Sequence, residues 1–232
     1  MPGYGQFCPV AVACEIFAER WTPLILRELF QGSRRFSEIR RGMPLISRAL
    51  LTQRLRHLED AGVIASVPAG RGREYRLTQA GAEFHVVIEG LGAWGQRWVH
   101  GRASAENLDS TLLLWNIRRR LAVDQLPDRR VVVRFEFRGV PPGRGPSIAW
   151  LVVSRQDVDL CLKDPGFGVD LVVVAQLRSF IRVWLGDIAF NQAVRAGEVR
   201  LEGSRDLVRA FPGWLLLSHF ARVERPRPAR AS

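Results

Sequence analysis

Residues 34–62 contain two helical patterns separated by a tight turn, and this arrangement constrains the fold more than any other stretch. The first pattern, RFSEIRRG, runs to Gly42. The second begins at Ser47, a residue type that caps helix N-termini, and runs to Gly62, a residue type that often follows helix C-termini. Between them, Pro44 disfavours helical backbone at the preceding residue. The stretch therefore predicts a short helix, a turn and a longer helix.

The longer helix has an apolar stripe and a polar side. The stripe consists of Leu50, Leu51, Leu55 and Leu58. The residues largely off the stripe are Arg48, Thr52, Gln53 and Arg56. Leucines at this spacing hold a helix to a core. A polar second helix after a tight turn is the plan of a helix-turn-helix unit, which places that helix in the major groove of DNA. There arginine pairs with guanine and glutamine with adenine.

The positive charge of the chain is concentrated in the same region. The formal net charge is +11, and residues 20–57 carry nine arginines against two glutamates. Neutralising phosphates requires cations that are close together, so the clustering favours a nucleic acid as partner, with an acidic membrane as the second choice. The alternative for each arginine is an ordinary solvated position.

The flanking segments complete a winged unit. Thr22 and Pro23 predict a helix start, with the Thr22 hydroxyl as N-cap, and this helix runs to Gly32. Residues 63–67 and 74–77 read as two short strands, and the turn between them, PAGRGR, carries Arg71 and Arg73. Residues 79–101 follow as one long apolar helix, which typically pairs with its twin in a dimer.

The first hundred residues resemble the HxlR family of bacterial winged helix-turn-helix regulators. The resemblance runs from about Cys8 to Trp98, through the segments WTPLILREL, RFSEI, ISRALLTQRL and YRLTQAG. It implies a homodimeric regulator that binds double-stranded DNA. The candidate DNA-contacting residues are Arg35, Ser37, Arg40, Ser47, Arg48, Thr52, Gln53, Arg56, Arg71 and Arg73.

Cys8 matches the cysteine near the start of HxlR-type domains, which some members use to sense oxidants. A helix N-terminus supports a reactive thiol because it favours the thiolate. The alternative is a small buried apolar residue. The chain has three cysteines, so we expect no disulfide framework. We expect reduced thiols in a cytoplasmic protein.

The second half of the chain predicts an α+β domain. We expect a winged domain at 1–101, a linker at 102–110, an α+β domain at 108–222 and a disordered basic tail at 223–232. Four strand patterns, then two helices, a fifth strand and a final helix predict a five-stranded sheet. In VVVRFEFRG the apolar positions 131, 133, 135 and 137 alternate with charged ones, which is typical of a half-buried strand.

This half resembles the sterol carrier protein type-2-like domains, on the pattern FIRVWLGDIAFNQAVRAGEVRLEGSRDLVRAF. The resemblance implies an apolar tunnel between sheet and helices that holds a hydrophobic small molecule. The candidate lining residues are Trp115, Phe135, Trp150, Phe180, Trp184 and Phe190. The alternative for each is a plain core position.

The sequence contains no motif for catalysis or for a metal. It has no P-loop, no GxSxG and no HExxH, and its four histidines do not fall at metal-ligand spacings. No signal peptide and no membrane span are expected. We therefore expect a non-enzymatic transcriptional regulator without a cofactor, responsive to an apolar effector. The alternative is a hydrophobic-ligand carrier with a basic surface.

Overall fold

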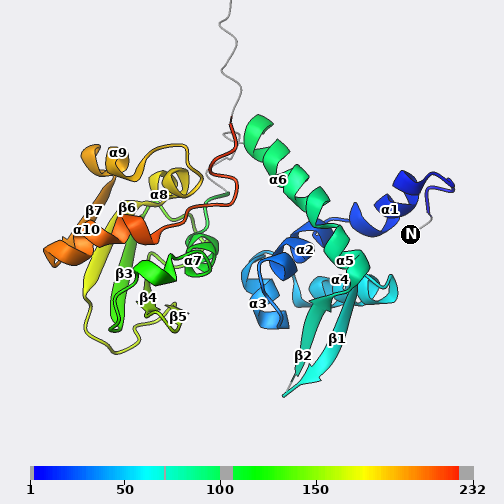
Figure 1. The fold of residues 1–232 in the computed structure, drawn as a ribbon, viewed down its shortest axis with the longest axis horizontal. Helices are drawn as coiled ribbons and strands as arrows, with labels where there is room; N and C mark the ends of the chain where they lie inside the picture. Colours follow the sequence, from blue (N-terminus) through cyan, green and yellow to red (C-terminus); the bar gives the residue numbers. More distant parts are fainter. Residues whose placement is uncertain (1–2, 71, 100–106, 225–232) are drawn as a thin grey trace, which may run out of the picture. The chain divides into compact units, whose positions relative to one another are not determined.

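The computed structural model describes residues 3–70, 72–99 and 107–224. The chain divides into two compact units, residues 1–92 and 93–232, and the division falls inside one helix (Figure 1). The expected boundary at residue 101, most of the expected linker and nearly all of the expected tail lie outside the described residues. Leu108 and Asp109, which the linker was expected to include, are buried.

The first unit is built mainly from helices, with one two-stranded sheet. Its elements are α1 (Pro9–Phe17), α2 (Thr22–Phe30), α3 (Phe36–Arg41), α4 (Arg48–Asp60), β1 (Ile64–Ala69), β2 (Gly72–Leu77), α5 (Gln79–Glu83) and the first part of α6 (His85–Trp98). β1 and β2 form an antiparallel hairpin, and they extend further into the expected turn than the sequence suggested.

The leucine stripe of α4 is part of the core, as expected. Leu51, Leu55 and Leu58 are at most 1% exposed and pack with Ile25 and Leu29 of α2. Leu50 is half-buried at the edge of the same cluster. The opposite side of α4 is left to solvent, which confirms the amphipathic pattern.

The expected N-cap of α2 is wrong. Thr22 is the first residue of the helix, and Trp21 occupies the N-cap position with a left-handed φ of 81°. A turn in which the Thr22 amide donates to the carbonyl of Glu19 starts the helix one residue early. The Thr22 hydroxyl is consequently buried and caps nothing, and it has no hydrogen-bond partner among the described residues.

The single helix expected over residues 79–101 is also wrong, because the chain turns at Phe84. Thr78 caps α5 as expected, accepting a hydrogen bond from the amide of Gly81. The amide of Phe84 then donates to the carbonyl of Gly81, which closes α5 with a tight turn before α6 begins. The Phe84 ring stacks on Phe17 of α1, with ring centroids 3.6 Å apart, and this contact fixes the turn.

The second unit is a five-stranded sheet with helices. Its elements after α6 are α7 (Ser110–Arg118), η2 (Val123–Gln125), β3 (Val131–Arg138), β4 (Ile148–Val153), β5 (Val158–Cys161), β6 (Leu171–Gln176), α8 (Leu177–Trp184), α9 (Phe190–Arg195), β7 (Val199–Gly203) and α10 (Arg205–Trp214). The strand order is β5-β4-β3-β6-β7. Within this sheet, the central strand β3 pairs in parallel with β6, and the other neighbouring strands are antiparallel. The α+β class and the five-stranded sheet are confirmed.

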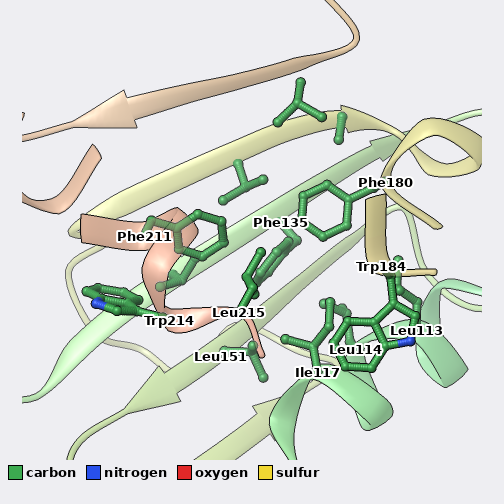
Figure 2. Close-up of a cluster of buried hydrophobic side chains, with 14 of the residues drawn as sticks. Leu113, Leu114, Ile117, Phe135, Leu151, Phe180, Trp184, Phe211, Trp214 and Leu215 are labelled. Atoms are coloured by element: carbon green, nitrogen blue, oxygen red, sulfur yellow. The ribbon is translucent and has the colours of Figure 1, made fainter. Parts of the chain in front are cut away.

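The core of this unit lies between one face of the sheet and its helices (Figure 2). Val131, Val133, Phe135 and Phe137 of β3 are at most 4% exposed, whereas Arg134 and the other charged positions point to the opposite face. The expected alternation is therefore confirmed. Phe135 lies at the centre and contacts rings from α8 and α10.

Candidate nucleic-acid interface

The turn between α3 and α4 is held from both sides. At the start of α3, the carboxylate of Glu38 accepts hydrogen bonds from the amides of Arg34 and Arg35, at 2.8 and 3.0 Å. At the start of α4, the Ser47 hydroxyl accepts from the amide of Leu50 at 3.2 Å, so the expected cap is confirmed. Such caps satisfy amide groups that have no partner inside the helix. The two helices therefore begin at fixed positions.

The outward side of α4 presents three exposed polar side chains from the expected set: Arg48, Gln53 and Arg56. Thr52, on the same side, is half-buried, and its hydroxyl donates to the carbonyl of Arg48 at 2.9 Å. An open groove of about 770 Å³ runs along this side and is lined by Gln53 and Arg56 among others. Thr52, Gln53 and Arg56 thus share this groove, whereas Arg48 does not line it.

Not every arginine of the basic region faces solvent. Arg54 turns inward, where its Nε donates to the carbonyl of Arg20 and its Nη1 forms an ion pair with Glu19. On α3, Ser37 is exposed, whereas Arg40 is half-buried. This separation into structural and accessible arginines follows from helix position, because residue 54 lies beside the leucine stripe.

The hairpin of β1 and β2 carries Arg73, which is exposed but engaged. Its Nε donates to the hydroxyl of Ser66 at 2.7 Å, and its Nη2 lies 3.4 Å from the carboxylate of Glu59. A phosphate would have to replace these contacts. Arg35 lies within 3.9 Å of Glu74 on β2, so its side chain is also next to the hairpin. Arg71 lies outside the described residues.

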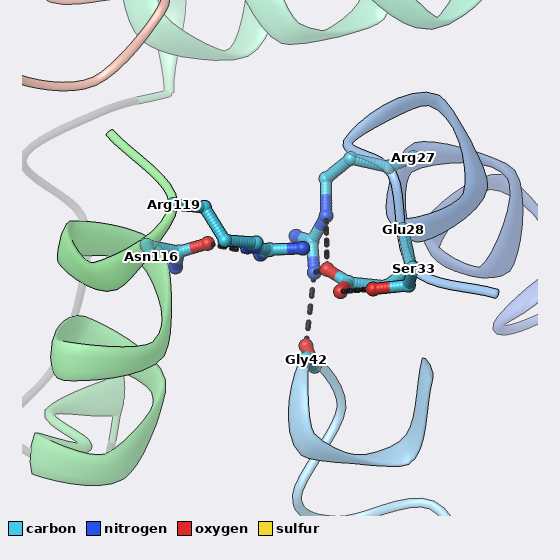
Figure 3. A network of polar contacts seen from close by, with 6 residues as sticks. All are labelled: Arg27, Glu28, Ser33, Gly42, Asn116 and Arg119. Carbon is cyan, nitrogen blue, oxygen red and sulfur yellow. Dashed lines mark hydrogen bonds and ion pairs between the residues drawn. The ribbon is translucent and has the colours of Figure 1, made fainter. Parts of the chain in front are cut away.

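A buried ionic network behind α3 was not expected from the sequence (Figure 3). Glu28 of α2 is fully buried, and its carboxylate accepts from Arg27 Nη2 at 2.8 Å and from the Ser33 hydroxyl at 3.3 Å. Arg27 also donates to the carbonyl of Gly42 at 2.9 Å. The network therefore ties α2 to the end of α3. The sequence pattern could have predicted that Glu28 is buried, because it falls at helical spacing among the apolar residues of α2.

Cys8 occupies the N-cap position of α1 and is exposed. Hydrogen bonds from the amides of Ala11 and Val10 lower the pKa of its thiol. In contrast, burial, with a further effect of the Asp159 carboxylate, raises the pKa of the Cys161 thiol. Cys8 is therefore exposed and not a buried apolar residue, and the pKa of its thiol is lowered.

The helix expected to form a dimer has an uncovered apolar stripe. Val87, Leu91, Trp94 and Trp98 of α6 recur at helical spacing, and each is between 42% and 58% exposed. On α1, Val10 and Val12 are likewise 70% and 49% exposed. Exposed apolar side chains along one side of a helix, as on α6, are typical of a protein interface.

The six aromatic residues expected to line a ligand pocket do not share one surface. Phe135, Phe180 and Phe190 belong to one chain of contacting rings, and Trp184 packs into the same core. Trp150 pairs with Arg134 across β4 and β3, on the opposite face of the sheet. Trp115 on α7 has the guanidinium groups of Arg118 and Arg119 each 5.2 Å from its ring centroid.

Over residues 3–70, 72–99 and 107–224, no group of three or more histidine, cysteine or acidic side chains could hold a metal ion. No helix in the same ranges is long and apolar enough to cross a membrane.

Comparison with known proteins places the first part of the chain among regulators. Residues 16–103 match the HxlR-like helix-turn-helix family. An uncharacterised HTH-type transcriptional regulator of Mycobacterium tuberculosis is 42% identical over 93 residues, which are 39% of this chain and 58% of the relative. The chain thus spans somewhat more than half the length of that relative. The uncharacterised regulator YvaP of Bacillus subtilis is 35% identical over 98 residues, which are 40% of this chain and 91% of YvaP.

Solved structures of regulators are also similar to part of the chain. The reduced form of the transcriptional regulator YodB from B. subtilis is 27% identical, with a TM-score of 0.36, and the match covers 43% of this chain and all of YodB. The redox regulator HypR in its oxidised form is 28% identical, with a TM-score of 0.37, over 38% of this chain and 95% of HypR.

Proposed function

The chain belongs to the HxlR-like helix-turn-helix family, and from that premise we propose that it is a dimeric transcriptional regulator that binds double-stranded DNA in a sequence-dependent way. The observation that carries the proposal is the outward side of α4. Arg48, Gln53 and Arg56 are exposed there on a helix whose start is fixed by the Ser47 cap and whose other side is buried.

In this proposal α4 enters the major groove, and the other candidate residues position it. Arginine and glutamine are the side chains that read guanine and adenine edges, and each good contact is worth about 1–3 kcal/mol of discrimination. Arg35, Ser37 and Arg40 on α3, with Arg71 and Arg73 on the hairpin, contact the phosphate backbone. Backbone contacts fix orientation without carrying sequence information directly.

The dimer forms through the exposed apolar stripe of α6 together with α1. Burying a large apolar side chain contributes about 1.5–3 kcal/mol, so the four residues of the stripe can supply a substantial part of the association energy. Two copies of α4 would then lie about 34 Å apart and read a two-fold site with half-site centres about 10 bp apart. Such a regulator acts on chromosomal DNA in the cytoplasm.

The second unit is proposed to hold an apolar effector that changes DNA affinity. Its resemblance to sterol carrier domains and its helices packed over one face of a five-stranded sheet support this. The ligand would separate the ring of Phe190 from the rings of Phe180 and Phe211, both of which it now contacts. An effector shifts DNA binding only by its different affinity for the two arrangements, typically 1–3 kcal/mol.

Selection of bound duplexes from random DNA tests the DNA-binding function. We expect a two-fold consensus to emerge. The alternative of a ligand carrier would be favoured by two results together. No consensus would be recovered, and cell lipid extract would displace a fluorescent fatty acid from the protein. Repeating the selection with the lipid extract present tests the effector: an unchanged yield and no displacement would leave the second unit without a ligand role.

A further inference from the structure

Two helices of the second unit carry arginines without a carboxylate partner among the residues that the structure describes. Arg178 and Arg182 on α8 are exposed, and so are Arg205 and Arg209 on α10. Each pair is four residues apart, which places both members on the same side of their helix. Within residues 3–70, 72–99 and 107–224, none of the four forms an ion pair with a carboxylate; the ion pairs of this unit involve other arginines.

Both arginine pairs point away from the sheet. α8 buries Leu177, Phe180 and Val183, and α10 buries Leu207 and Phe211, all in the core that contains Phe135 of the sheet (Figure 2). The two helices therefore lie on the same side of the sheet with their apolar stripes inward. Their exposed arginines consequently lie on the outer surface of that side, and we call these four together the arginine face: Arg178, Arg182, Arg205 and Arg209.

Four other arginines of the same unit are paired with carboxylates. Arg134 pairs with Glu136 and Arg200 with Glu202, each at 2.7 Å, on the sheet face opposite the core. In the loops beside the strands, Arg129 lies 2.8 Å from Asp170, and Arg155 lies 2.7 Å from Asp128. On α10 the exposed carboxylate of Asp206 lies between the two arginines in sequence, without an ion pair to either. These four arginines, each with a carboxylate partner, thus differ from the four exposed arginines of α8 and α10.

The chemistry of the arginine face fits a phosphate backbone. No large apolar side chain of α8 or α10, both of which are fully described, is exposed. A helix that lies in a membrane interface inserts an apolar face, which these helices have already buried in the core. Phosphate contacts require only accessible cations. We propose that the arginine face binds the backbone of duplex DNA flanking the site read by α4, an inference that rests on the proposed DNA-binding function.

Two variants with the same net charge test this proposal in the full-length protein. The first replaces the arginine face: Arg178→Gln, Arg182→Gln, Arg205→Gln and Arg209→Gln. The matched control replaces four paired arginines of the same unit: Arg129→Gln, Arg134→Gln, Arg155→Gln and Arg200→Gln. The affinity of each protein is measured against salt on the selected site with flanks of about two helical turns on each side. Unfolding curves confirm that both variants fold.

Each phosphate contact contributes about 0.9 to the slope of log affinity against log salt. The first variant should therefore lose up to about 3.6 of the wild-type slope per protomer, or about 7.2 for the proposed dimer. The control should retain the wild-type slope. Trimming the flanks should reduce the slope of the wild type but not that of the first variant. Equal slopes for the two variants would overturn the proposal.

Binding to lipid vesicles tests the alternative that the arginine face binds an acidic membrane and not DNA. One combination of results would contradict the proposal: the wild type binds phosphatidylserine vesicles, the first variant does not, and the salt dependence of DNA binding is the same for both. The arginine face would then be a membrane-binding surface. A protein that binds all duplexes equally would contradict the sequence-reading function instead. In that case the slopes on arbitrary duplex would still decide whether the arginine face contacts DNA.

Discussion

The carboxylate of Glu28 occupies the position that a β-carbon on residue 42 would take, so Gly42 is required by space and not by backbone conformation. Its φ of −73° is open to any residue. The glycine at the end of α3 therefore allows the buried glutamate, and Arg27 with it, to reach the turn that precedes α4. The turn that precedes α4 is therefore packed against the buried carboxylate and hydrogen-bonded to Arg27.

Gly42→Ala is expected to destabilise the protein by about 1–3 kcal/mol, the usual cost of forcing atoms into a packed site. Gly90→Ala on α6 is the control, because nothing lies within 4 Å of a β-carbon there. That change should stabilise the helix by about 0.5–1 kcal/mol. Denaturant unfolding measures both. In a double-mutant cycle, the Gly42→Ala penalty should shrink in a Glu28→Ala background; additive effects would show that the carboxylate is not the obstacle.

Gln53→Ala is expected to change which base is preferred at one position of each half-site. A direct contact is worth about 1–3 kcal/mol of discrimination, equivalent to roughly 5- to 150-fold in relative affinity. The measurement is competitive binding of duplexes that differ at single positions. Gln79→Ala, an exposed glutamine outside the interface, is the control and should leave every preference intact. A uniform loss of affinity across all duplexes would exclude base reading by Gln53.

Leu91→Glu on α6 is expected to weaken the dimer by at least tenfold, because the substitution places a charge in the apolar stripe. Val86→Glu is the control: Val86 is 72% exposed but lies about a quarter of a turn or more off the stripe. Sedimentation over a range of concentrations measures the dissociation constant. If both variants dimerise like the wild type, the dimer forms through another surface.

The cysteines are expected to differ in the pH dependence of alkylation. The thiolate is the reactive form, so a lowered pKa moves the onset of reaction to lower pH and a raised pKa moves it higher. Amide hydrogen bonds lower the pKa of Cys8, and burial raises the pKa of Cys161. The midpoint for Cys8 should therefore lie below that for Cys161.

Proteins retaining a single cysteine allow the measurement with iodoacetamide. One carries Cys14→Ser and Cys161→Ser, and the other carries Cys8→Ser and Cys14→Ser. Coincident midpoints in the two proteins would mean that the N-terminus of α1 has no effect on the Cys8 thiol. Unfolding both in denaturant should bring the midpoints together, because the local environments are then lost.

Local features of this chain were predictable and non-local ones were not. The caps at Ser47 and Thr78 and the alternation around Phe135 depend on neighbours in sequence, so residue type was sufficient to find them. The start of α2 at Thr22 depends on a turn at Trp21, and the break at Phe84 depends on a ring from α1. For the interface, residue type identified which side of α4 is accessible, but not that Arg73 is already held by Ser66 and Glu59.

The parallel pairing of β3 with β6 has a consequence for synthesis of the chain. β3 can pair with β4 as soon as β4 emerges, but its other edge stays open until residues 171–176 have been made. An open, apolar strand edge is a template for pairing with other chains. The contacts of the β1–β2 hairpin are close in sequence and can form early. We therefore expect nascent chains that stop after β5 to aggregate, whereas chains that reach β6 have closed the centre of the sheet.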